Sequence, residues 1–336
     1  MGPTELDVFF RRMFSLRVPK VIILLTLLVS WMPDQGDVKT EIQVIEYFAG
    51  VGRIARMAHA VGLQSTAVDL EYGKEKARVS GRRNSMDLNS NAGLVLAIKL
   101  ILRAKFNDLV AVFAMCCSSF VPVNRGTGSR DLLVPEGDEN VVSVRRSNKL
   151  LSRTVILMVL AICAGGTIIM ENPQNSLVAM QGRFAWLVEL LSGQNISMYK
   201  IQFWMRKHLA LTWKRTWVWS SSRRIRALDL GPMTASERSC SVQTTKRYKK
   251  EGKQKWHGTK ALKQTQEYTY RYARNIVQLF PDMVDMDKSL LDLFMEANYD
   301  EFWDESSDLR DALLYCRGSS RICIPHEWRA ALPTHL

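Results

Sequence analysis

Cysteine and histidine are scarce in this sequence, which has 6 cysteines and 5 histidines in 336 residues. No two cysteines form a CxxC pair, and the adjacent Cys116 and Cys117 cannot both be well placed for a structural bridge. This shortage excludes a disulfide-framed domain, and no spacing of cysteine and histidine matches a zinc site. We therefore expect reduced thiols, no metal, and an intracellular location in the nucleus or an organelle.

Long apolar runs are also lacking. The run at residues 21–32 is shorter than the roughly 20 residues that a membrane-spanning helix needs, which excludes a multi-pass membrane protein. Basic residues precede it, as in a signal peptide, but no small-x-small cleavage site follows. Residues 1–40 are thus either a targeting or anchor segment or an N-terminal helix packed on the protein. We expect membrane contact only through residues 18–32.

Acidic residues are outnumbered, with 33 Asp and Glu against 46 Lys and Arg and a formal net charge of +13. The hydrophobic content of 47% excludes a wholly disordered chain. Residues 201–280 hold 18 basic and 4 acidic residues, whereas residues 281–317 hold 3 basic and 11 acidic ones. The basic stretch predicts a polyanionic partner such as nucleic acid. Our hypothesis for the acidic segment is that it covers this stretch in the free protein.

Strand and helix patterns alternate from residue 41 onward. The predicted strands are residues 42–48, 64–69, 85–88, 108–115 and 167–170, with closing strands at 196–204 and 216–220. The predicted helices are residues 53–61, 92–103, 147–164, 184–192 and 268–280. Strands separated by helices predict an α/β fold, a three-layer sandwich with a mainly parallel, Rossmann-like sheet.

Composition divides the chain into four regions, and no internal repeat is visible. Residues 1–40 are the N-terminal segment, and residues 41–230 are the main domain. Residues 231–280 combine a basic stretch, expected to be a loop over most of residues 233–263, with a last helix. Residues 281–336 are the acidic C-terminal segment.

A glycine loop, Phe48-Ala49-Gly50-Val51-Gly52, stands between the first predicted strand and helix. Glycines there allow the backbone to approach a ligand closely. Asp69 ends the next strand, where a carboxylate can accept from ribose hydroxyls, and Asp87 ends the third, where it can accept from an adenine amino group. The third glycine of a dinucleotide fingerprint is missing, which disfavours NAD. The ordered set predicts a nucleoside cofactor.

Cys117 and Glu171 each follow a predicted strand at the edge where open α/β sheets bind ligands. A cysteine there can be a nucleophile only as thiolate, which requires a pKa of about 6.5 rather than the usual value of about 8.5. The alternative is a small buried hydrophobe. Glu171, in Glu171-Asn172-Pro173, can hydrogen-bond a polar ring or act as an acid or base, or it can simply begin a turn.

Basic and aromatic residues alternate near the closing strand. Lys214 and Arg215 precede Trp217 and Trp219, a pattern that suits phosphate contacts and base stacking, although alternate tryptophans also arise from packing on one sheet face. Arg223 and Arg224 follow the same strand. We expect the four basic residues of this region to contact nucleic acid: Lys214, Arg215, Arg223 and Arg224.

Taken in order, these motifs resemble the DNA cytosine-C5 methyltransferases, a branch of the class I S-adenosylmethionine-dependent methyltransferases. The resemblance covers residues 44–220, with a weaker likeness at residues 268–280. The sequence is also similar to uncharacterised proteins of protist algae, with which it shares residues 123–127, 171–173 and 258–268. The likeness implies a methyltransferase that uses S-adenosylmethionine and acts on cytosine, in DNA rather than RNA.

The resemblance also implies roles for single residues. Phe48, Ala49, Gly50 and Gly52 would line the methionine and ribose part of the cofactor. Asp69 would bind the ribose and Asp87 the adenine. Cys117 would attack C6 of cytosine, and Glu171 would hold the N3/N4 edge of that base. Two alternatives stay open: a catalytically inactive nucleic-acid-binding protein with the same sheet, and a methyltransferase for a small molecule or protein.

Overall fold

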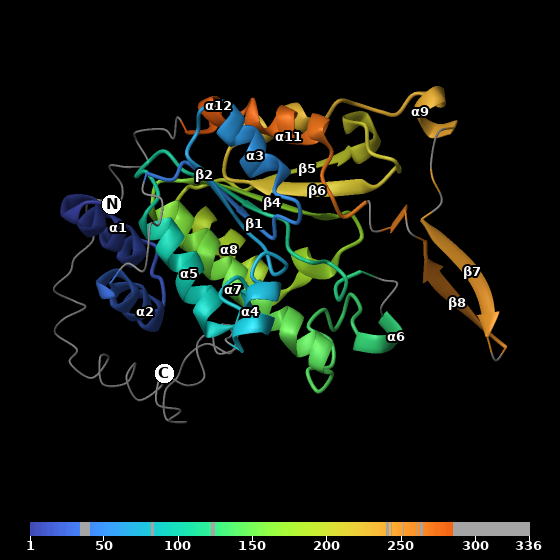
Figure 1. Ribbon diagram of the computed structural model, residues 1–336, viewed down its shortest axis with the longest axis horizontal. Coiled ribbons are helices and arrows are strands. Elements are labelled where there is room, and N and C mark those ends of the chain that lie inside the picture. Colours follow the sequence, from blue (N-terminus) through green and yellow to red (C-terminus); the bar gives the residue numbers. More distant parts are fainter. Residues whose placement is uncertain are drawn as a thin grey trace.

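The computed structural model describes residues 1–33, 41–81, 84–121, 125–239, 242, 244–250, 252–259, 261–262 and 265–284. Figure 1 labels its elements. The strands are β1 (Val44–Tyr47), β2 (Ser65–Val68), β3 (Val110–Phe113), β4 (Thr167–Pro173), β5 (Tyr199–Trp204), β6 (Arg215–Ser220), β7 (Thr245–Lys250) and β8 (Lys253–Gly258). The α-helices are α1 (Pro3–Ser15), α2 (Lys20–Trp31), α3 (Arg53–Ala60), α4 (Lys74–Ser80), α5 (Asn91–Leu102), α6 (Arg125–Gly128), α7 (Val142–Cys163), α8 (Gly182–Ser192), α9 (Ala235–Ser239), α11 (Tyr270–Val277) and α12 (Phe280–Val284). The 3-10 helices are η2 (Leu177–Met180), η3 (Met205–His208) and η4 (Arg223–Leu228).

Six strands form one sheet in the order β2-β1-β3-β4-β6-β5. The strands β1 to β4 are parallel to one another, whereas β6 runs antiparallel to both of its neighbours. The central strands β1 and β3 are buried along their whole length, as their apolar sequences predict. The predicted α/β fold with a mainly parallel, Rossmann-like sheet is confirmed.

Helices cover both faces of the sheet, which makes the three layers (Figure 1). The helices α3, α11 and α12 lie on one face, and α5, α7 and α8 lie on the other. Helix α7 is central to the second layer because every residue from 151 to 163 is buried. It ends at Ala164, and Gly165 with φ of +74° turns the chain into β4.

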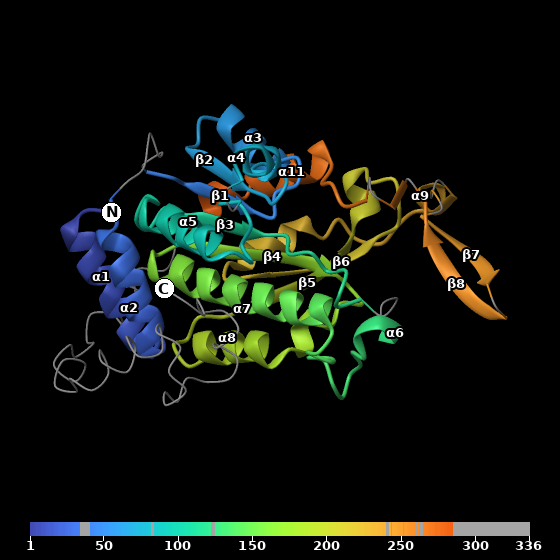
Figure 2. The same ribbon diagram turned by 60° about the horizontal axis from the view of Figure 1, so that its bottom comes forward.

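The N-terminal helices pack at the end of the second layer (Figure 2). Residues 21–26 and Val29 of α2 are buried, whereas Leu28 and Trp31 are exposed. Helices α1 and α2 share one hydrophobic core with α5 and α7. Residues 3–15 and 20–31 thus form packed helices in the structure, and a targeting or anchor role for residues 1–40 stays a prediction. Within the described residues, no helix has both the length and the apolar character to cross a membrane.

The predicted strand at residues 85–88 is wrong, because this segment forms turns. The Asn84 side chain accepts from the backbone N–H of Met86 at 2.9 Å, and the Asp87 side chain accepts from that of Asn89 at 2.9 Å. Such local side-chain bonds compete with strand pairing. Asp87 therefore lies in the turn before α5 and does not end a strand.

The region from residue 233 to 263 contains more regular structure than the expected loop. Its described residues include α9 and the antiparallel strands β7 and β8, which pair with each other. The predicted last helix is present as α11, which begins when Thr269 caps the backbone N–H of Tyr272 at 3.0 Å. The expectations for Val123, Asn124 and residues 285–336 lie outside the described residues.

Three buried arginines connect helix α7 to the loops around it. Arg130 donates to Asn148 of α7 at 2.8 Å and to the backbone carbonyls of Pro135 and Glu136 at 2.6 and 2.9 Å. Arg153 and Arg12 likewise donate to backbone carbonyls, at the start of α5 and at the end of α7. Burial lowers the pKa of each of the three guanidinium groups to about 10, which leaves them charged at neutral pH.

Candidate functional site

The carboxyl ends of β1, β2, β3 and β4 lie at one edge of the sheet because these strands are parallel. Strand β6 runs the other way and so begins at the same edge. Ligands of open α/β sheets bind at this edge. The predicted residues that the fold brings to it are Phe48, Ala49, Gly50, Gly52, Asp69, Cys117, Glu171, Lys214 and Arg215.

The glycine loop is a turn of left-handed residues, with φ of +60° at Phe48, +56° at Gly50 and +67° at Gly52. Its Gly50 N–H donates to Asp69 Oδ2 at 2.8 Å, which joins the ends of β1 and β2. A Cβ on Gly50 would meet nothing within 4 Å, whereas one on Gly52 would lie 2.8 Å from the Tyr72 hydroxyl. The loop therefore leaves open space above Gly50 for a ligand.

The two predicted cofactor carboxylates lie on the same side of the sheet. Asp69 Oδ1 accepts from the Glu71 N–H at 2.9 Å. The Asn84 amide donates to the Leu70 carbonyl at 2.7 Å and so holds the turn that carries Asp87 against the segment after Asp69. Both carboxylates are half-buried and accept only backbone N–H groups in these contacts. Their oxygens are acceptors, which suits the hydroxyls and the amino group of a nucleoside.

Glu46, inside β1, is a residue that sequence reasoning missed. It is fully buried, and its Oε2 accepts from the Ala55 N–H at 2.8 Å at the start of α3. Its other oxygen, Oε1, has no partner among the described residues. Burial raises the pKa of Glu46 to about 7, and the nearby Asp69 adds to this effect. The only sequence signal is a charged residue within an apolar strand.

Glu46→Gln is expected to remove a pH dependence of stability. Because the folded protein holds the Glu46 proton up to about pH 7 and the unfolded chain releases it near pH 4.5, stability of the wild type falls as pH rises through this window. The full loss is on the order of 3 kcal/mol. Urea unfolding at pH 5 to 8 would show a smaller decline in the variant, and the exposed Glu75→Gln would behave as wild type. Parallel pH profiles for Glu46→Gln and wild type would contradict this assignment.

Glu171 lies buried near the end of β4 and is held from two sides. Its Oε1 lies 3.1 Å from Lys214 Nζ, and the Tyr268 hydroxyl donates to its Oε2 at 3.2 Å. Burial opposes the charge on Lys214, but Glu171 and Cys117 outweigh it and raise the pKa of that lysine. Tyr268, which the sequence placed only in a helix, thus orients the carboxylate.

Cys117 occupies the turn after β3 and is half-buried beside this pair, while Cys116 is exposed. The Phe120 N–H donates to the Cys117 carbonyl at 2.8 Å and closes the turn. Burial raises the pKa of Cys117 to about 11, and Lys214 opposes this rise. The free protein therefore holds Cys117 as a thiol at neutral pH, contrary to the lowered pKa that a resting nucleophile requires.

Alkylation of Cys117 by iodoacetamide is expected to accelerate about tenfold for each pH unit from 7 to 10, because only the thiolate reacts. Lys214→Met should slow it at every pH, since the lysine favours the thiolate, whereas the exposed Lys74→Met should not. Peptide mass spectrometry would separate Cys117 from the other cysteines. A rate that levels off below pH 8 would contradict the raised pKa.

A cavity of about 250 Å³ opens at the same edge of the sheet. Lys214 forms part of its wall, so the cavity adjoins the Glu171 pair. Arg53, at the start of α3, lines it together with Glu267, and their side chains pair at 3.0 Å. Apolar residues of η3 and of the segment after it, together with three threonines, complete the lining. The wall is therefore mixed, with apolar surface and with charged and hydroxyl groups that can bond to a small polar ring.

The structure separates the four predicted nucleic-acid contacts. Arg215 begins β6 at the site edge, where its guanidinium lies 4.2 Å from the centre of the Trp204 ring. Arg223 and Arg224 are exposed on η4, which follows the other end of β6. Six strand residues separate them from the site, about 20 Å of chain. They are not part of this site, and any nucleic-acid contact there stays a prediction.

Within the part of the chain that the structure describes, no group of three or more His, Cys, Asp or Glu side chains could hold a metal ion. No family model matches the sequence, and no curated protein does. Among solved structures, the chain is similar to the methyltransferase EhMeth of Entamoeba histolytica, with 15% identity and a TM-score of 0.34. That match covers 54% of this chain and 53% of the other, about half of each. The fold assignment rests on the sheet itself.

Proposed function

We propose that this chain is an S-adenosylmethionine-dependent methyltransferase that methylates C5 of cytosine in nucleic acid, with DNA as the preferred substrate. The observation that carries the proposal is the convergence of Cys117, Glu171 and Lys214 from three different elements at one sheet edge. The glycine loop and Asp69 lie on neighbouring strands of that edge. A nucleophile, a ring-binding carboxylate and a cofactor loop are the parts that this reaction requires.

The glycine loop, Asp69 and Asp87 would hold the cofactor, which supplies an electrophilic methyl group when bound. Cys117, as thiolate, would form a bond from Sγ to C6 of the cytosine, and the electron pair of the C5–C6 bond would move to C5. Glu171 would hold the N3/N4 edge of the ring. After C5 is methylated, a water molecule would accept its proton, and the C5–H electron pair would restore the double bond and expel Sγ as thiolate. The target base must leave its stack to reach Cys117.

Lys214 has two roles in this proposal. It stabilises the Cys117 thiolate, and it holds Glu171 at 3.1 Å, an interaction strengthened by burial. Arg215 and the rest of the basic stretch from Arg206 to Arg274 would contact the phosphate backbone. Such a substrate implies an intracellular location in the nucleus or an organelle.

Calorimetric titration with S-adenosylmethionine tests the cofactor, and tritium transfer from labelled cofactor to duplex DNA tests the acceptor. We expect saturable binding by the wild type and weaker binding by Asp69→Ala, with label recovered as 5-methylcytosine. Glu75→Ala is the control, because Glu75 is an exposed carboxylate on α4. Absence of cofactor binding would reject the enzyme, and label on protein or small molecules instead of DNA would reject the proposed acceptor.

The raised pKa of Cys117 favours a second candidate, a catalytically inactive protein that binds nucleic acid through the same surface. A thiol that stays protonated at neutral pH adds slowly to C6. This candidate predicts nucleic-acid binding that weakens steeply with salt, without cofactor binding or transfer. The same calorimetric titration separates the two candidates.

A further inference from the structure

Strands β7 and β8 form a two-stranded antiparallel ribbon, in register from Thr245 opposite Gly258 to Lys250 opposite Lys253. The tight end of the ribbon contains Gly252 with φ of +72°, a left-handed conformation that favours glycine in hairpin turns. At about 3.4 Å per residue, six residues a strand make a ribbon about 20 Å long.

The ribbon is strongly basic. The sequences of its two strands, TKRYKK and KQKWHG, contain six lysine and arginine residues and no acidic residue. Between Glu237 and Glu267 the sequence has one acidic residue, Glu251. The side chains of Lys246, Tyr248 and Lys249 are exposed. Charge of one sign along the ribbon indicates a polyanionic partner.

The ribbon projects away from the layered body, beyond the end of the sheet where the candidate site lies (Figures 1 and 2). In both views it is distant from α1 and α2, at the opposite end of the molecule. A two-stranded hairpin is at best marginally stable on its own in water. A polyanionic partner would therefore stabilise a projecting basic hairpin.

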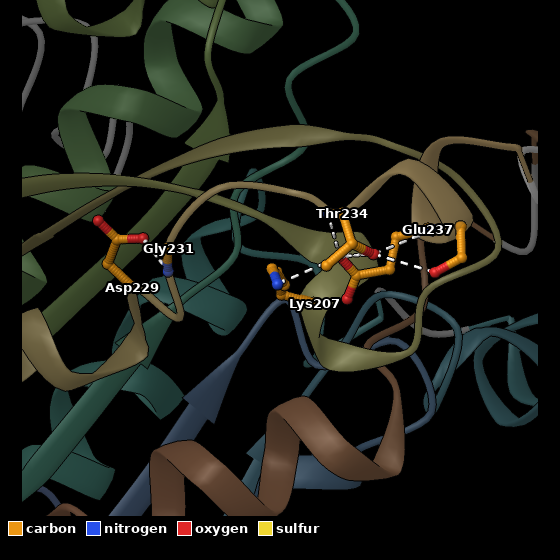
Figure 3. Close-up of polar contacts among 6 residues, drawn as sticks. Lys207, Asp229, Gly231, Thr234 and Glu237 are labelled. Atoms are coloured by element: carbon orange, nitrogen blue, oxygen red, sulfur yellow. Dashed lines mark hydrogen bonds and ion pairs between the residues drawn. The ribbon is translucent and has the colours of Figure 1, made fainter.

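The base of this arm is fixed to the body. Glu237 of α9 pairs with Lys207 of η3 at 3.1 Å, and its Oε2 also accepts from the Thr234 N–H at 2.7 Å (Figure 3). The backbone N–H bond from Thr234 and the ion pair lower the pKa of Glu237. Because η3 also supplies Met205 to the cavity wall, the arm is anchored beside the candidate site.

We propose that the β7–β8 ribbon enters the major groove of duplex DNA and holds it against the sheet edge. The proposal deepens the proposed function by naming the duplex as the substrate form. The major groove of B-DNA, about 12 Å wide, admits a two-stranded β-ribbon, whereas the deep, narrow major groove of duplex RNA does not. Single strands are bound on platforms of stacked aromatic rings. The ribbon sequence has two aromatic residues, Tyr248 and Trp256, against six lysine and arginine residues, so charge dominates it.

The test compares Lys246→Ala/Lys249→Ala with a control of equal charge change, Arg17→Ala/Lys105→Ala. Both control residues are exposed, and Arg17 lies between α1 and α2 and Lys105 after α5. The probes are one 20-base-pair DNA sequence as duplex DNA, as duplex RNA and as single-stranded DNA, with vesicles of anionic phospholipid as a fourth. Fluorescence anisotropy would give Kd over a salt series.

We expect the ribbon variant to bind duplex DNA at least tenfold more weakly at 0.1 M salt, with the salt slope reduced by about 2, since each phosphate contact contributes about 0.9. The control should change Kd less than twofold. Equal Kd for the two variants would overturn the proposal. So would equal losses on single strands or duplex RNA, or a loss confined to vesicles.

The outcome of the duplex-binding experiment does not depend on whether the protein transfers a methyl group. If duplex binding depends on the ribbon but calorimetry detects no cofactor, the ribbon assignment stands and the methyltransferase proposal fails. If tritium is transferred to DNA but the ribbon variant binds the duplex with the same Kd as wild type, the methyltransferase proposal stands and the ribbon assignment fails.

Discussion

Cys117→Ser is expected to reduce methyl transfer to cytosine by about 10³-fold or more, because removing the nucleophile of a covalent mechanism removes the step that activates the ring. The serine hydroxyl is a much weaker nucleophile than a thiolate at every accessible pH. The substitution removes little volume from a half-buried position, so the turn closed by the Phe120 N–H should persist. Tritium transfer under single-turnover conditions measures the loss.

Cofactor binding provides the internal control for this variant. The contacts of the glycine loop with Asp69 do not involve Cys117, so the calorimetric affinity should stay within about twofold of wild type. Cys116→Ser is the matched control, because Cys116 is an exposed neighbour with a bond to the Ser118 side chain. Full transfer by Cys117→Ser would exclude the covalent mechanism, and loss in both serine variants would point to damage of the turn.

Arg130→Ala is expected to lower the free energy of unfolding by about 3–4 kcal/mol, because it removes a buried charged donor that bonds to several neutral acceptors. The guanidinium is 2% exposed and donates to side chains and carbonyls of the loop and of α7. It also lies 4.3 Å from the centre of the Phe120 ring. Alanine would take from the Asn148 side-chain oxygen the donor that Arg130 supplies. The Pro135 and Glu136 carbonyls would each lose one of two donors, because Gln181 and Asn148 also donate to them. Urea unfolding followed by circular dichroism measures the change.

Two variants make the Arg130 experiment decisive. Arg145→Ala removes an exposed arginine from the first turn of α7, and its cost should stay below about 0.5 kcal/mol. Arg130→Lys keeps the charge but loses the planar guanidinium with its several N–H donors, so the free energy of unfolding should fall by an intermediate amount. A loss under 1 kcal/mol for Arg130→Ala would show that water or neighbouring groups replace the arginine.

Most of the sheet could be predicted because its strands are short apolar runs and its helices have clear periodicity. The predicted strand at residues 85–88 failed because Asn84 and Asp87 bond to the local backbone, which apolar patterning does not reveal. The ribbon was missed for a related reason. The described side chains of β7, residues 246–249, are exposed, and no alternation of apolar and polar residues marks either strand sequence.

The position of a candidate site residue was predictable where it directly follows a parallel strand, as Asp69 does, or lies in the turn after one, as Cys117 does. It was not predictable where tertiary packing decides the environment. The partner of Glu171 is Tyr268, 97 residues away, and the raised pKa of Cys117 comes from burial. The direction of β6 also matters, because it places Lys214 at the site but Arg224 at the other end.

The buried Arg130 has a consequence for how the segment between β3 and α7 moves. Its guanidinium bonds to Ser119, to the carbonyls of Pro135 and Glu136, and to Asn148 within α7. Opening at Ser119, at residues 135–136 or at Asn148 would break a bond to the same group. The turn after Cys117 and the first turns of α7 are therefore coupled through one side chain, and we expect them to open together.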